Sequence, residues 1–251
     1  MMRFSDLHTV EYFHLLFVAQ LGARLDKKLY ALKGGCNLRF FWKSIRYSED
    51  VDFDVHTIAK HTLQKNVEAI LRAPGFNQIL RSSKIELLRF SASKQTDTTQ
   101  RWKIHLQSET SGIDLPAKIE FSRRKFDPGI VFGPADPEIL HTYHLRPIIA
   151  SHYDFEATFA QKIDALTGRK ETQARDIFDL AFLSERGATG SRLPADREKL
   201  AKARKIVLSA SFDQFRSQVA AFLSSEHQDY YGTREAWHSL RDGLARKLEK
   251  L

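Results

Sequence analysis

A strict alternation of acidic and apolar residues constrains the fold of this chain more than any other feature. From Asp50 to Val55 the sequence is Asp-Val-Asp-Phe-Asp-Val. Successive side chains of a strand point to opposite faces, so this segment predicts a strand with three aspartates on one face and three apolar residues on the other. The apolar face requires a core. The carboxylates of Asp50, Asp52 and Asp54 would repel one another, which indicates a bound counter-charge, and a divalent metal ion is the natural candidate.

A glycine pair precedes this strand. The run from Tyr30 to Lys33 predicts a short buried strand, which Gly34 and Gly35 close in a tight turn. Glycine lets backbone N–H groups come close to a phosphate, and the helical spacing of residues 37–42 would add a helix N-terminus. A lone glycine pair is ordinarily a turn, and a lone Asp-x-Asp is ordinarily a solvated acidic run. Their order and proximity together favour a phosphate-binding site.

Two stretches of the sequence resemble motifs of the AbiEii-like nucleotidyltransferase toxin family. The first comprises Leu32–Gly35, Leu38-Arg39 and Arg46–Phe53, and the second comprises Lys162–Leu166, Arg169 and Arg175–Leu180. The segment between them matches the family only in its pattern of strands, so the resemblance covers roughly residues 25–185. Two positions depart from the family: Cys36 stands where Thr is usual, and a third acid such as Asp54 is not a general feature.

The resemblance implies a metal-dependent nucleotidyltransferase, which moves a nucleoside monophosphate from a nucleoside triphosphate (NTP) to an RNA acceptor, with the 3′ end of a tRNA as the expected acceptor. It also implies the toxin component of a toxin-antitoxin or phage-defence system, with a cognate antitoxin as a partner. Two Mg²⁺ ions would assist the transfer. Two other classes stay open: a nucleotidyltransferase that acts on a small molecule or protein, and a catalytically silent nucleotide- or RNA-binding relative.

The resemblance further implies roles for single residues. Asp50, Asp52 and Glu120 would be catalytic and would hold the metal ions, since nucleotidyltransferase-like folds commonly take a third carboxylate from a neighbouring strand. Lys162 would be catalytic by neutralising charge on the triphosphate. The expected contacts to the nucleotide are Gly34, Gly35, Ser48, Lys162, Arg175 and Asp176.

Glu120, Lys162, Asp176 and Asp179 could each have a purely structural role instead of a catalytic one. Glu120 lies on the polar side of a predicted strand at residues 117–122, where it could equally be a surface residue paired with Arg123 or Arg124. Lys162 would ordinarily be solvated or salt-bridged. Asp176 and Asp179 lie three residues apart on a predicted helix and so face the same way, with Arg175 able to pair with Asp179. These acids could orient Lys162 and Arg175, contact the acceptor, or form a salt-bridge network that docks the helices.

The predicted elements indicate an α/β (α+β) fold in two parts. Residues 1–147 would form a nucleotidyltransferase-like domain with a mixed sheet, and residues 148–251 would form a helical domain that, by the resemblance, completes the active site. The segment 125–146 is rich in Pro, Gly and Asp, which favours a connection there. Besides the segments above, we expect helices at 6–24, 57–72, 155–166, 175–185, 194–210, 212–224 and 234–250, and strands at 84–91 and 101–107.

Composition limits the setting and the partners. The chain has 39 Lys and Arg against 31 Asp and Glu, a formal charge of +8 that favours polyanions such as nucleotides and RNA, although a charged surface also serves solubility. Cys36 is the only cysteine, so no intramolecular disulfide is possible, and we expect a reducing, cytoplasmic location. No apolar run approaches the length of a membrane span. Neither a zinc pattern nor a hydrolase elbow is visible.

Overall fold

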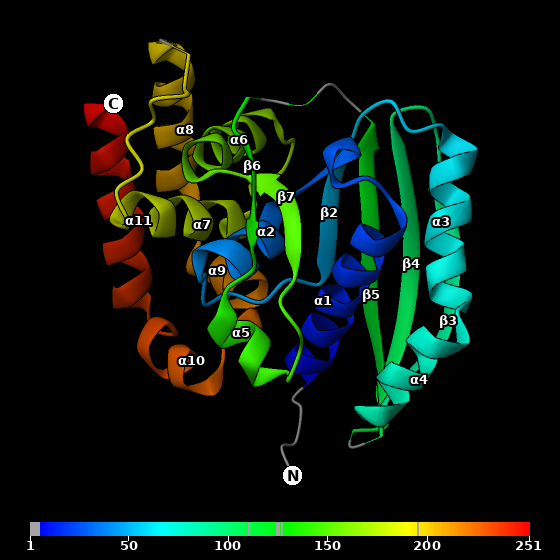
Figure 1. Ribbon diagram of the computed structural model, residues 1–251. Coiled ribbons are helices and arrows are strands. Elements are labelled where there is room, and N and C mark those ends of the chain that lie inside the picture. Colours follow the sequence, from blue (N-terminus) through cyan, green and yellow to red (C-terminus); the bar gives the residue numbers. More distant parts are fainter. Residues whose placement is uncertain (1–5, 110, 124–125, 127, 195) are drawn as a thin grey trace. The chain divides into compact units, whose positions relative to one another are not determined.

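The computed structural model describes residues 6–109, 111–123, 126, 128–194 and 196–251 (Figure 1). The chain divides into two compact units. The first comprises the chain up to Phe41 together with Tyr47–Tyr153, and the second comprises Trp42–Arg46 and Asp154–Leu251. In the described residues, all strands belong to the first unit, which is α/β, and the second unit is helical.

The described part of the first unit contains a mixed sheet of seven strands. Its spatial order is β3-β4-β5-β2-β1-β7-β6. The pairs β2–β5 and β1–β7 are parallel, and the remaining pairs are antiparallel, which confirms the predicted mixed sheet. The strands are β1 (Tyr30–Lys33), β2 (Asp50–Val55), β3 (Ile85–Gln95), β4 (Thr99–Ser108), β5 (Asp114–Arg123), β6 (Ile130–Pro134) and β7 (Ile149–Tyr153).

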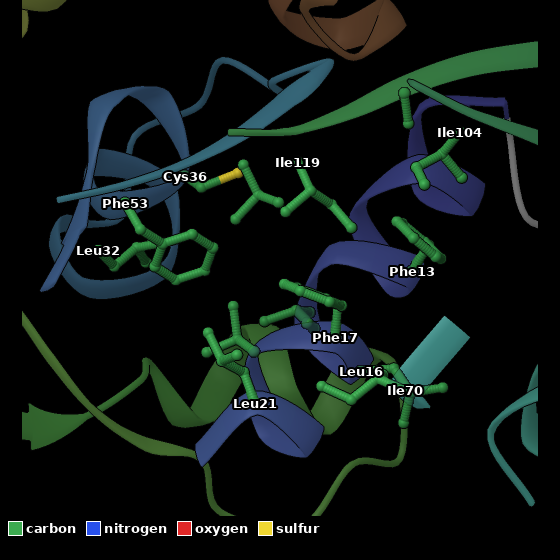
Figure 2. Packing of buried hydrophobic residues seen from close by; sticks show 14 of the residues in the cluster. Phe13, Leu16, Phe17, Leu21, Leu32, Cys36, Phe53, Ile70, Ile104 and Ile119 are labelled. Carbon is green, nitrogen blue, oxygen red and sulfur yellow. The ribbon is translucent and has the colours of Figure 1, made fainter. Parts of the chain in front are cut away.

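One face of this sheet carries the core. Helix α1 (Asp6–Arg24) contributes Phe13, Phe17 and Leu21, which point toward apolar side chains of the strands (Figure 2). Phe53 of β2 stacks on Phe121 of β5, with ring centroids 4.9 Å apart. The predicted face of Val51, Phe53 and Val55 is fully buried. Burial of apolar surface on this scale is the dominant stabilising term of a domain.

The other helices of the first unit do not all begin at the predicted residue, and the one expected from residue 57 begins at Lys60, since Thr57 has a φ of +62°, which an α-helix does not allow. They are α2 (Gly34–Trp42), α3 (Lys60–Arg72), α4 (Pro74–Ser82) and α5 (Pro137–Thr142), with a 3₁₀ turn at Lys27–Leu29. Pro74 ends α3 as predicted, but it also starts α4, because a helix tolerates proline at its first position. Helix α2 begins at Gly34 itself, three residues before the helical spacing was expected to start.

The segment 125–146 is not a plain connection. It contains strand β6 and helix α5, whose first turn is capped by the carboxylate of Asp136. Residues 124, 125 and 127 lie outside the described part. Strand β7 follows, past the boundary expected at residue 147, and belongs to the first unit because it pairs with β1 and β6. Five-residue strands next to prolines give little periodicity, so local spacing did not predict them.

The second unit consists of helices, and side chains of Asp, Ser or Thr cap the N-termini of all its described α-helices except α7. They are α6 (Phe155–Gly168), α7 (Ala174–Glu185), α8 (Arg197–Ser209), α9 (Phe212–Gln218), α10 (Ser225–Tyr231) and α11 (Arg234–Lys250), with a 3₁₀ turn at Ala220–Phe222. The helix expected at 212–224 stops at Gln218, since Val219 leaves helical backbone angles. Trp237 stacks on Phe215 in the core, with ring centroids 4.7 Å apart. Across the described residues, we find no helix whose length and apolar character would let it span a bilayer.

Candidate active site

The glycine turn meets the acidic strand at Gly34 and Asp52. Strand β1 ends at Lys33, whose Cα is the register partner of Asp52, and α2 begins at the next residue. Gly34 has φ +70°, and a Cβ there would lie 2.8 Å from Oδ2 of Asp52. Both the backbone angle and this close approach require glycine. The geometry therefore brings the start of a helix and a carboxylate into direct proximity, as the order of motifs predicted.

Asp50 is held at the start of β2 from two directions. Its carbonyl oxygen accepts hydrogen bonds from Ser48 Oγ at 2.9 Å and from Cys36 Sγ at 3.2 Å. Its Oδ2 accepts from Lys118 Nζ at 2.7 Å. Its Oδ1 is buried and has no hydrogen-bond partner among the described residues. A buried carboxylate oxygen without a partner is costly, so this atom is a candidate ligand for a cation.

Asp54 is a structural residue. Its carboxylate is fully buried, and it accepts from Lys33 Nζ at 2.6 Å and from Tyr153 Oη at 2.9 Å. Lys33 Nζ also donates to Ser122 Oγ at 2.9 Å. These contacts tie β1, β2, β5 and β7 together. Asp54 shares the strand face of Asp50 and Asp52, but its carboxylate is engaged in an ion pair with Lys33 on the neighbouring strand β1.

Glu120 lies beside Asp52. Strands β2 and β5 run parallel, and Asp52 and Glu120 are register partners, so their side chains share one face of the sheet. Glu120 Oε2 also accepts from Arg101 Nε at 2.6 Å. Its cationic partner is therefore Arg101 and not Arg123, which donates to Gln100 Oε1 at 2.8 Å and to the carbonyl of Ile58. Arg124 lies outside the described residues.

The donor set fits a hard cation in part. In the portion of the chain that the structure describes, no three His, Cys, Asp or Glu side chains are grouped to hold a metal ion. Mg²⁺ does not require such a group, because it is commonly held by one or two carboxylates together with substrate phosphates and water. Asp50, with its unpartnered Oδ1, and Asp52 on the same strand face provide two such carboxylates. Glu120 is engaged by Arg101.

The second motif forms a buried ion network within the second unit. Lys162 Nζ of α6 lies 2.9 Å from Asp176 Oδ1 and 2.6 Å from Asp179 Oδ2, both on α7. Arg46 grips Asp179 with two hydrogen bonds of 3.0 and 2.8 Å, and Arg169 Nε lies 2.9 Å from Asp176 Oδ2. The cations at Asp179 are thus Arg46 and Lys162, whereas Arg175 was the expected partner. Arg175 itself is half-buried on α7.

In this network, neighbouring opposite charges shift the pKa values of Lys162 and Asp179 more than burial does. Burial alone would lower the pKa of Lys162, but the attraction of Asp176 and Asp179 is larger together, and the pKa is raised. Burial would raise the pKa of Asp179, but Arg46 and Lys162 lower it to about 2. Lys162 and Asp179 are therefore both charged at neutral pH. The network docks α6, α7 and the Trp42–Arg46 segment to one another, which agrees with the salt-bridge network among the alternatives that the sequence left open.

Comparison with protein families identifies the chain. The family described as nucleotidyl transferase AbiEii toxin, type IV toxin-antitoxin system, matches residues 16–250. This match spans nearly the whole sequence and both motifs. The chain belongs to the AbiEii toxin family.

Solved structures share the fold of this AbiEii-family protein. JHP933 from Helicobacter pylori is 19% identical, with a TM-score of 0.60 over 99% of this chain and 96% of its own. The nucleotidyltransferase toxin MenT4 (Rv2826c) from Mycobacterium tuberculosis is 17% identical, with a TM-score of 0.62 over 98% of this chain and 85% of its own. The mixed sheet of the structure and its similarity to these solved structures confirm the predicted α/β (α+β) fold. No curated protein matches the sequence.

For four basic residues of this AbiEii-family protein, the sequence analysis did not predict the acidic partner. Lys33, Arg101 and Lys118 pair with acids of the sheet face, and Arg46 pairs with Asp179. Lys118 shows a signal, since it alternates with apolar residues in step with Glu120 and so had to share its face. Arg46 lies inside the first motif. The partners of Lys33 and Arg101 depend on strand register, which single strands do not reveal.

Proposed function

We propose that this AbiEii-family protein is a Mg²⁺-dependent nucleotidyltransferase that moves a nucleoside monophosphate from an NTP to an RNA acceptor, the 3′ end of a tRNA. The observation that supports this most is the approach of Gly34 to Asp52, which joins a helix start to an acidic strand. Helix starts present N–H groups to phosphate, and paired carboxylates suit the metal ion that accompanies a triphosphate. The proposal includes toxicity, a cognate antitoxin and a cytoplasmic location.

In this proposal, Asp50 and Asp52 hold the metal ions through their carboxylates. Bound Mg²⁺ would supply Lewis-acid stabilisation of phosphate charge and would lower the pKa of an acceptor hydroxyl. The backbone at Gly34 and Gly35 orients the triphosphate, and Ser48 keeps Asp50 in place through its bond to the Asp50 carbonyl. Glu120, beside Asp52, completes the acidic face.

Lys162, Arg175 and Asp176 lie in the second unit, and their contacts to the nucleotide stay predictions that rest on the family resemblance. Lys162 would neutralise charge that develops on the pyrophosphate. Its present partners are Asp176 and Asp179. As a mobile point charge on a flexible stem, Lys162 would exchange these carboxylates for the phosphates when a nucleotide binds.

A labelling assay tests the function. Purified protein is incubated with Mg²⁺, total RNA and each α-labelled NTP in turn, and the same is done with Asp52→Asn and with Asp97→Asn, an exposed aspartate in the turn between β3 and β4. We expect label in small RNA with the native protein and with Asp97→Asn, and loss of at least 100-fold with Asp52→Asn, in the range of a lost catalytic group.

Other outcomes of this assay identify the other classes. Label on protein or on a small molecule, without dependence on RNA, would indicate the alternative acceptor. No label with any NTP, while calorimetry still detects nucleotide binding, would indicate a silent binder. Transfer that persists after removal of divalent ions with a chelator would contradict the metal dependence.

A further inference from the structure

Several cations line the sheet face that carries the acids, and four of them on β3, β4 and β5 are connected to one another or to the acids by strand register. We call Lys94, Arg101, Lys103 and Lys118 the cationic strip. Strand β4 turns Trp102 and Ile104 into the core, and β5 does the same with Ile119 and Phe121. The alternating residues therefore face the other side of the sheet. Lys94 and Lys103 are exposed, and the side chains of Arg101 and Lys118 are 36% and 41% exposed.

Strand register connects the cationic strip to the acids in two rows. In one row, Lys94 lies opposite Arg101, Arg101 opposite Glu120, and Glu120 opposite Asp52. In the other, Lys103 lies opposite Lys118, and Lys118 opposite Asp50. Neighbouring strands are about 4.8 Å apart. The cationic strip thus extends from Lys118, beside Asp50, across β4 to Lys94 on the outermost strand, β3, and Glu120 separates it from Asp52.

Like charges in this strip are placed directly opposite one another. Lys103 and Lys118 are register partners, as are Lys94 and Arg101. Like charges directly opposite one another on paired strands are destabilising. Arg101 and Lys118 recover part of this through Glu120 and Asp50. The cross-strand neighbours of Lys103 are Ser91 and Lys118, neither of which is an acid. An extended anion would remove the repulsion.

We propose that the cationic strip binds the phosphate backbone of the RNA acceptor and leads it to Asp50 and Asp52. This inference rests on the proposed function for the choice of RNA, since an RNA chain is the polyanion that must reach the acids. Charge complementarity supports it: a chain of phosphates matches a row of cations, and each lysine or arginine that neutralises a phosphate releases a counterion. Glu120 and Asp52 would repel the RNA backbone at the inner end, so the strip binds it at β3, β4 and β5.

The test measures RNA binding apart from catalysis. Binding of a labelled tRNA preparation is followed by fluorescence anisotropy, without NTP, from 50 to 200 mM KCl. The variant is Lys94→Glu/Lys103→Glu. The matched control is Lys65→Glu/Arg81→Glu on helices α3 and α4, which also lowers the formal charge from +8 to +4, because each reversal removes two charges. The four residues are exposed.

We expect the strip variant to bind tRNA at least about tenfold more weakly, and its salt slope to fall by about 1.4, the value for two single-strand phosphate contacts. The control should stay within about twofold of the native protein. Lys94→Gln/Lys103→Gln, which adds no negative charge, should show the same slope change with a smaller loss of affinity. Equal losses in strip and control variants, or no loss in the strip variant, would overturn the proposal.

A second polyanion separates RNA from an acidic protein. If polyglutamate binds the native protein as tightly as tRNA does and loses affinity in the strip variant, the occupant is an acidic polypeptide and the RNA proposal is wrong. Asp52→Asn is measured in parallel and should bind tRNA no more weakly than the native protein does, because it removes a charge that repels phosphate. Binding through the strip without any transfer of label would contradict the proposed function alone.

Discussion

Gly34 and Asp52 approach so closely that a Cβ on Gly34 would lie 2.8 Å from the carboxylate oxygen Oδ2 of Asp52. The contact joins the start of α2 to the second acid of β2, and it makes the backbone of one element depend on the rotamer of a side chain in another.

Gly34→Ala should impair transfer more than stability. Its φ of +70° costs an alanine about 1–2 kcal/mol, and the Asp52 carboxylate must rotate away from the new methyl group. We expect the free energy of unfolding in urea to fall by about 1–3 kcal/mol and label transfer to be lost. Gly75→Ala is the control, since a Cβ there meets no atom within 4 Å. Retained transfer in Gly34→Ala would show that the contact is unimportant.

Asp54→Ala should reduce stability, because it leaves Lys33 and Tyr153 without their shared acceptor in a buried setting. Breaking one side of a buried ion pair costs about 3–5 kcal/mol. The control is Asp97→Ala, whose exposed pair with Lys60 should give no measurable change in the urea midpoint. An Asp54→Ala protein with native stability and no transfer would instead make Asp54 a member of the catalytic site.

The loss of folding stability at acidic pH should depend in part on Asp179. Its pKa is lowered from 3.8 to about 2, so between these values the unfolded chain binds a proton that the folded chain does not. Stability from this group is therefore complete above pH 4 and is lost as the pH falls toward 2, on the order of 2 kcal/mol in all. Urea unfolding at pH 6 and pH 3 should show a smaller decrease for Asp179→Asn than for the native protein.

Lys162→Met should destabilise the second unit at neutral pH. The raised pKa of Lys162 means that its stabilising charge is present below pH 10 and is lost as the pH rises through that pKa. We expect a loss of about 3 kcal/mol in the free energy of unfolding, because Asp176 and Asp179 stay buried with one cation fewer. Lys199→Met, which breaks the more exposed pair with Asp164, serves as the control and should change little.

Cys36 should resist alkylation in the folded protein. Burial raises the pKa of its thiol well above the usual value, and the nearby carboxylates of Asp52, Glu11 and Asp50 add to the effect. The thiol should react with iodoacetamide only after unfolding. Cys36→Thr keeps a donor for the Asp50 carbonyl and should preserve transfer, whereas Cys36→Val removes the donor and should reduce it. Fast labelling of the native thiol would disprove the burial.

Local periodicity predicted the parts of the site that lie within one element. Strand β2 and the turn at Gly34 follow from spacing and residue type over a few positions. The placement of Glu120 beside Asp52 depends on parallel pairing of β2 with β5, which local spacing does not encode. The pairs Asp50–Lys118 and Asp179–Arg46 have the same origin, since their partners are separated by 68 and 133 residues in sequence.

The acids of the sheet face bring their own neutralisation, from Lys33, Arg101 and Lys118. Proteins whose acidic clusters are balanced only by an imported ion are unfolded until that ion arrives. This chain has no such requirement on its sheet face. The sheet face can therefore fold before any metal ion or nucleotide is bound.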